Sequence, residues 1–98
     1  METVFEIIDN KEYGKFEMVV EGKKAFVDYK TGQDKIFLTH TEVPRELEGR
    51  RLGSMLVRGV LENIAQTKYK IFPLCPFVAA YMKRHPEWNS YLAPGVNI

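Results

Sequence analysis

The chain has 98 residues, which is the length of one domain, and a net charge of +1. Its 45% hydrophobic and 28% charged content is that of a soluble globular protein. The charge argues against a general nucleic-acid binder, which usually carries a large basic excess. We expect a single domain over residues 1–98.

The only cysteine is Cys75, which excludes an internal disulfide and fits a reducing compartment. The first residues lack the basic start and long apolar run of a signal peptide, and no apolar run is long enough to span a membrane. We therefore expect a cytoplasmic protein without a membrane partner.

The first half of the chain predicts four strands. Apolar and polar residues alternate over 5–8, 16–20 and 25–29, and a fourth strand follows over 35–43. Turn-forming residues separate them at 10–14, 21–23 and 31–34. Because the links are short, the four strands are expected to form an antiparallel meander.

The period then changes to that of a helix. Leu52, Leu56, Val60 and Ile64 recur every four residues, which predicts an amphipathic helix over 52–66. A short apolar run at 69–74 predicts a fifth strand. Pro76 then opens a second helix that ends near residues 85–86, because proline favours the first helical position and disfavours helix just before it.

Residues 35–74 thus form a β-α-β unit, which is right-handed with parallel strands if both strands share a sheet. The fold class is α+β: a four-strand antiparallel meander, the β-α-β unit and a second short helix. Ligands of open α/β sheets bind beyond the carboxyl ends of the strands. Residues 40–43, the turn before the first helix and Cys75 all meet at that end.

The turn before the first helix is rich in cations and glycines. Its members are Arg45, Gly49, Arg50, Arg51 and Gly53. A helix N-terminus carries partial positive charge and free N–H groups, so arginines there favour a bound anion, and glycines let the backbone approach it. This pattern predicts a phosphate or pyrophosphate site. The alternative is a solvated loop whose arginines pair with Glu46 and Glu48.

The stretch Glu48-Gly49-Arg50-Arg51-Leu52-Gly53-Ser54 resembles the pyrophosphate-binding turn of GNAT acetyltransferases. That turn reads Gln or Arg, two residues, Gly, one residue, then Gly or Ala. Gly53 matches its last glycine, whereas Glu48 and Arg51 depart from the pattern. Residues 40–44 and 73–88 extend the resemblance to the short, stand-alone GNAT-like proteins of about this length, which lack the N-terminal helices of larger members.

The resemblance implies a minimal GNAT fold and acetyl-CoA or CoA as the cofactor. It implies that the backbone near Val43 pairs with the pantetheine arm, and that Arg45, Arg50 or Arg51 meets the ribose phosphate. Tyr81 matches a tyrosine that acts as a general acid near the leaving thiol. The implied pyrophosphate-binding residues are Gly49, Arg50, Arg51, Leu52, Gly53 and Ser54.

Acetyl transfer to an amine needs a base, and His40 has a suitable reference pKa and lies near the carboxyl end of a strand. Glu42 points to the same face if the strand is regular. The structural alternatives are a half-buried histidine bonded to backbone and a surface carboxylate near Arg45.

Cys75 lies just before a helix start, where a thiolate is stabilised and could accept an acetyl group. The alternative is a buried structural cysteine. His85 is expected to cap the second helix at its C-terminus. Cysteine and histidine spacing indicates no metal site.

The leading hypothesis is an acetyl-CoA-dependent N-acetyltransferase acting on a small amine or an exposed protein amine, as a monomer or weak homodimer. A second hypothesis is a module that binds acetyl-CoA or CoA with little or no turnover. A cysteine hydrolase that uses Cys75 and His40 is the third, and it lacks a nucleophile elbow.

Overall fold

A computed structural model describes residues 5–49 and 51–98 of the chain. Five strands, two α-helices and two 3-10 helices follow one another in these residues. They are β1 (Ile7–Asn10), β2 (Lys15–Val20), β3 (Lys23–Gly32), β4 (Lys35–Glu42), η1 (Arg45–Leu47), α1 (Leu52–Ala65), β5 (Lys70–Pro73), α2 (Pro76–Arg84) and η2 (Pro86–Tyr91).

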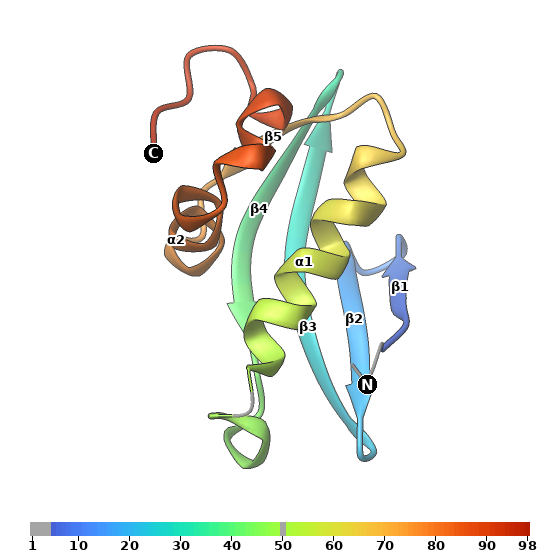
Figure 1. The fold of residues 1–98 in the computed structure, drawn as a ribbon. Coiled ribbons are helices and arrows are strands. Elements are labelled where there is room, and N and C mark those ends of the chain that lie inside the picture. Colours follow the sequence, from blue (N-terminus) through green and yellow to red (C-terminus); the bar gives the residue numbers. More distant parts are fainter. Residues whose placement is uncertain (1–4, 50) are drawn as a thin grey trace.

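The strands form one sheet in the order β1-β2-β3-β4-β5 (Figure 1). Strands β1 to β4 pair antiparallel, and β5 pairs parallel to β4 from Lys35–Lys70 to Leu38–Pro73. The predicted meander, the β-α-β unit and the α+β fold class are therefore confirmed. Helix α1 ends one residue before its predicted end, and the two 3-10 helices were not predicted.

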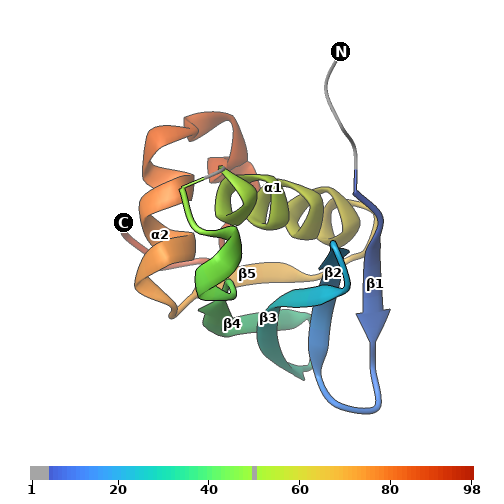
Figure 2. The ribbon, with the colours of Figure 1, turned by 90° about the horizontal axis from the view of Figure 1, so that it is seen from below.

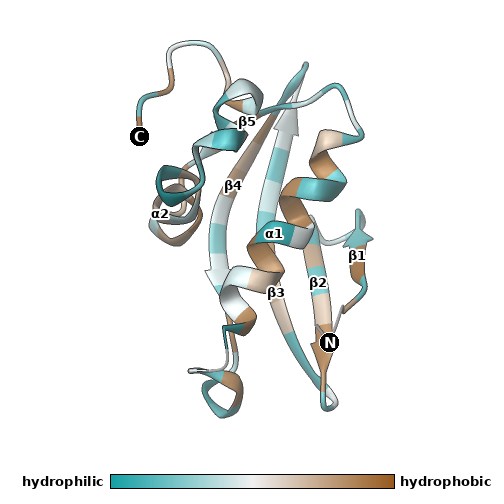
Figure 3. Ribbon diagram, viewed as in Figure 1, coloured by the Kyte–Doolittle hydropathy of each residue, from teal (hydrophilic) through white to brown (hydrophobic). Residues whose placement is uncertain are grey.

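The core lies between the sheet and α1. Helix α1 runs across one face of the sheet, and α2 lies on the same side (Figures 1 and 2). The apolar stripe of α1 is buried there, as are alternate residues of the strands (Figure 3). A fully buried leucine or isoleucine side chain contributes about 2 kcal/mol, so this shared core fixes α1 on the sheet.

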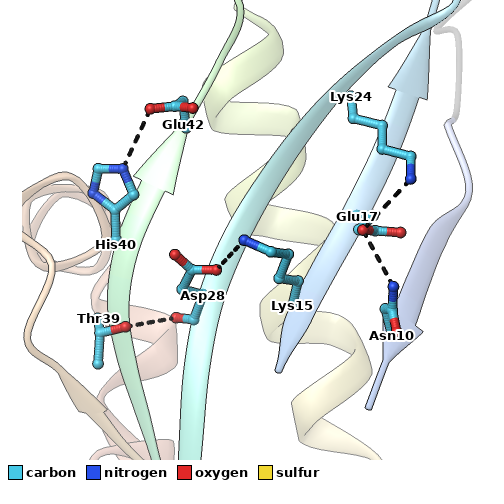
Figure 4. A network of polar contacts seen from close by, with 8 residues as sticks. All are labelled: Asn10, Lys15, Glu17, Lys24, Asp28, Thr39, His40 and Glu42. Atoms are coloured by element: carbon cyan, nitrogen blue, oxygen red, sulfur yellow. Dashed lines mark hydrogen bonds and ion pairs between the residues drawn. The ribbon is translucent and has the colours of Figure 1, made fainter. Parts of the chain in front are cut away.

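The opposite face of the sheet, here called the outer face, carries charged side chains (Figure 4). Lys15 Nζ lies 2.7 Å from Asp28 Oδ1 and 3.9 Å from the centre of the Phe26 ring. Glu17 accepts a hydrogen bond from the Asn10 side chain at 3.4 Å. No helix of the described residues covers this face.

Strand β4 contains one extra residue. Asp28 pairs with His40 and the next residue, Tyr29, pairs with Leu38, so Thr39 is unmatched and forms a β-bulge. Leu38 is fully buried on the α1 side. Strict alternation would turn His40 to that side as well; the bulge instead turns it to the outer face.

Candidate active site

Strand β4 extends beyond its partner β5. Pairing between them ends at Leu38, and the Cys75 N–H then donates to the Leu38 carbonyl at 2.8 Å as the chain enters α2. From Thr39 to Glu42 the edge of β4 that faces away from β3 has no strand partner among the residues that the structure describes. We call this stretch the free edge of β4. An extended ligand can pair with such an edge through backbone hydrogen bonds.

His40 and Glu42 stand together on the outer face beside the free edge (Figure 4). His40 Nε2 lies 3.5 Å from Glu42 Oε1, and their side chains are 57% and 60% exposed. The Phe26 ring lies 6.4 Å from the imidazole, centre to centre. An imidazole that is open to a ligand on this face is a suitable acceptor for the proton of an amine.

Cys75 lies on the other side of β4. Its thiol donates a hydrogen bond to the Thr41 hydroxyl at 3.3 Å, and the residue is only 5% exposed. Because Thr41 lies between His40 and Glu42, its side chain points to the opposite face of the strand. The structure therefore pairs Cys75 with Thr41 and His40 with Glu42, which does not assemble the cysteine–histidine dyad of the hydrolase hypothesis.

The N-terminus of α1 has the features of an anion site. Its N-cap residue, Arg51, is left-handed with φ 59°, no side chain of the described residues caps the helix, and its first turn holds no acidic residue. The first N–H groups of an α-helix have no partner within the helix. Gly49 has φ 80°, and a Cβ there would meet no atom within 4 Å, so the backbone is open on that side.

The turn arginines are not neutralised by the nearby glutamates that the structure describes. Glu46 pairs with Lys23 at 3.1 Å, and its own backbone hydrogen bond and Lys23 hold the pKa of its carboxyl below the usual value. Arg45 and Arg51 are exposed and form no ion pair within residues 5–49 and 51–98. Arg50 lies outside the described residues. Arg45 and Arg51 are therefore accessible to an anion, and the anion site stays a prediction.

Gly53 has a packing role that the sequence did not reveal. A Cβ at this position would lie 2.7 Å from the Phe77 ring of α2, so the missing side chain lets the two helices approach. Substitutions at Gly53 therefore change helix packing as well as any ligand contact. Leu52 is buried at 4% exposure and anchors the helix start, while Val43 and Ser54 are half-buried.

The family model for the GCN5-related N-acetyl-transferase matches residues 15–91. The chain belongs to this family. The match runs from β2 through η2 and includes the free edge of β4, the turn before α1 and the start of α2. A search of curated proteins returned no match.

Tyr81 lies on α2, and its phenol is buried. It is 5% exposed, and burial raises the pKa of its phenol, which keeps the hydroxyl protonated at neutral pH. Its ring stacks on that of His85 at 4.2 Å. His85 is the C-cap residue of α2, where its N–H donates to the Met82 carbonyl at 3.1 Å.

Two residues of this candidate site were missed by sequence reasoning. Thr41 contacts the Cys75 thiol. Thr39 forms the bulge that decides on which side of the sheet the later side chains of β4 lie. The sequence contained one hint of the bulge: Leu38 and His40 are two residues apart, so strict alternation would place the polar His40 in the core beside Leu38.

Within the described residues, no helix has both the length and the apolar character needed to cross a membrane.

Proposed function

We propose that the protein transfers an acetyl group from acetyl-CoA to the primary amine of a small molecule or of an exposed protein side chain. One observation carries the proposal: the free edge of β4 has His40 and Glu42 on one side and the Cys75–Thr41 pair on the other. A thioester held along that edge would lie between the two pairs.

The residues present suit acetyl-CoA, the donor expected for this family. The N-terminus of α1, which no side chain of residues 5–49 and 51–98 caps, suits a pyrophosphate, with Arg45 and Arg51 exposed in the same turn. The free edge of β4 offers backbone donors and acceptors to the two amides of the pantetheine arm, up to Val43. Gly49 leaves room for the phosphates next to the backbone.

When bound, acetyl-CoA supplies an activated acetyl thioester. His40 accepts the proton that the amine nitrogen loses as the new N–C bond forms, with Glu42 Oε1 3.5 Å from its Nε2. The family resemblance assigns to Tyr81 the proton that the departing sulfur takes up as the C–S bond breaks; its phenol carries that proton because burial raises its pKa.

Direct transfer suits the contacts of Cys75 better than a covalent intermediate. A nucleophilic thiol must lose its proton, and its hydrogen-bond partner here, the Thr41 hydroxyl, is no base at neutral pH. Cys75 then serves as a wall of the site and as the N-cap residue of α2.

The test is the release of free CoA from acetyl-CoA, measured with and without a panel of polyamines, amino acids and lysine peptides. The proposal expects release that depends on an amine and a product heavier by one acetyl group. CoA binding without amine-dependent release would instead support a binding module with little or no turnover. Equal release without any amine would support hydrolysis and contradict the proposal.

A further inference from the structure

A pocket of about 330 Å³ lies at the C-terminal end of α1. Asn63 and Ile64 of the last turn of α1 line it. The other lining residues come from β1, the β1–β2 turn, β2, β3, β4 and the segment between α1 and β5. Helix α1 has 14 residues. At the usual rise per residue its ends are about 20 Å apart, so this pocket is separate from the turn proposed to hold acetyl-CoA.

The inner wall of the pocket is apolar and partly aromatic. Phe16, Ile36 and Ile64 are buried at 4%, 2% and 1% exposure, and they line it on the core side. Tyr29 and Tyr69 are half-buried lining residues, and the Tyr29 ring lies 4.8 Å from that of Phe16. Such a surface suits an apolar or aromatic side chain of a small ligand.

The rim of the pocket carries one charge of each sign. The Tyr29 hydroxyl donates to Asp9 Oδ1 at 2.5 Å, which orients the Asp9 carboxylate at the rim. Lys11 lines the same rim, and neither Asp9 nor Lys11 forms an ion pair with any residue in the described ranges. The carbonyl end of α1 adds partial negative charge near Asn63.

We infer that this pocket binds a zwitterion, an α-amino acid with an aromatic or branched apolar side chain. Asp9 and the end of α1 receive its ammonium group, Lys11 receives its carboxylate, and Phe16 and Tyr29 contact its side chain. A zwitterion gives Asp9 and Lys11 an opposite charge each, whereas a ligand with a single charge serves only one of them. This site does not depend on the proposed acetyl transfer.

The test is a titration of the ¹⁵N-labelled protein followed by amide shifts in NMR. The probes are L-phenylalanine, phenethylamine, which lacks the carboxylate, hydrocinnamate, which lacks the ammonium, and glycine, which lacks the side chain. L-phenylalanine is expected to shift the amides of Thr31, Asn63 and Tyr69 in a saturable way. Phenethylamine, hydrocinnamate and glycine are each expected to bind at least about tenfold more weakly than L-phenylalanine.

Asp9→Asn and Lys11→Met are each expected to weaken the binding of L-phenylalanine about tenfold. The control is Lys83→Met on helix α2, which is expected to leave this binding unchanged. Asparagine can still accept the Tyr29 hydrogen bond, so Asp9→Asn is expected to fold, and its amide spectrum checks this. Unshifted pocket amides with every probe would overturn the inference. Equal binding of phenethylamine and L-phenylalanine would overturn the role of Lys11 and the zwitterion assignment.

Discussion

At the scale of single residues, Thr39 decides which side chains β4 presents to a ligand. As the extra residue of a bulge it turns His40 and Glu42 to the outer face and Thr41 toward Cys75. The two pairs then flank the free edge of β4. Bulges often re-aim side chains next to active sites, and the placement here agrees with that role.

The imidazole of His40 is expected to act as the base. His40→Ala should lower the turnover number for a verified amine by roughly a hundredfold, because general-base assistance is lost. Added imidazole should restore part of the rate in this variant, which a purely structural role would not allow. Glu42→Gln should cause a smaller loss. Full activity of His40→Ala would remove the histidine from the mechanism.

The thiol of Cys75 is expected to be dispensable for chemistry. Cys75→Ala should keep much of its rate, because the Thr41 hydroxyl cannot remove the thiol proton. Intact mass measurement after incubation with acetyl-CoA should show no thioester on the wild-type protein. An acetyl group on the Cys75 peptide that hydroxylamine removes, together with an inactive Cys75→Ala, would establish the covalent route instead.

At the scale of elements, α1 meets the edge strand β1 through a glycine. A Cβ at Gly59 would lie 2.5 Å from Ile7 Cγ1. Glycine in a helix interior costs about 1 kcal/mol relative to alanine, so the close contact explains why it is there. Overpacking costs about 1–3 kcal/mol, so Gly59→Ala should lower the free energy of unfolding despite its higher helix propensity.

A double-mutant cycle with Ile7→Ala checks this contact by chemical denaturation. Ile7→Ala removes the clashing Cγ1, so Gly59→Ala should become neutral or stabilising in that background. The same loss of stability in both backgrounds would show that the contact between α1 and β1 is not the cause.

The elements followed from the sequence because local patterns determine them. Alternation in β2 and the four-residue spacing from Leu52 to Ile64 reflect burial on one face, and Pro76 marks the start of α2. The bulge at Thr39 and the Gly53–Phe77 approach depend on contacts between distant segments, so periodicity does not reveal them. The anion site was predicted from residue types, whereas the free edge of β4 needed the strand pairing.

At the scale of the whole molecule, two tyrosines make stability depend on alkaline pH. Burial raises the pKa of Tyr29 and Tyr81, and the hydrogen bond to Asp9 raises that of Tyr29 further. Tyrosines of the unfolded chain ionise near pH 10. Their contribution to stability is therefore complete below about pH 10 and is lost as the pH rises above it, because the unfolded state then releases protons that the folded state retains.

Urea unfolding below and above about pH 10 measures this effect. The free energy of unfolding should fall at the higher pH, and Tyr29→Phe should make that fall smaller. Absorbance of tyrosinate should show fewer ionised phenols in the folded protein than in urea. An unchanged pH dependence in Tyr29→Phe would show that Tyr29 ionises equally in both states.

The proposed function requires acetyl-CoA to lie along the free edge of β4 with its pyrophosphate at the N-terminus of α1. The most direct measurement is an NMR titration of the ¹⁵N-labelled protein with acetyl-CoA. The largest amide shifts are predicted in residues 39–43 and 49–54, with Asn63 and Tyr69 at the far end of α1 nearly unchanged. Saturation without shifts in those two segments, or the absence of any shift, would contradict the claim.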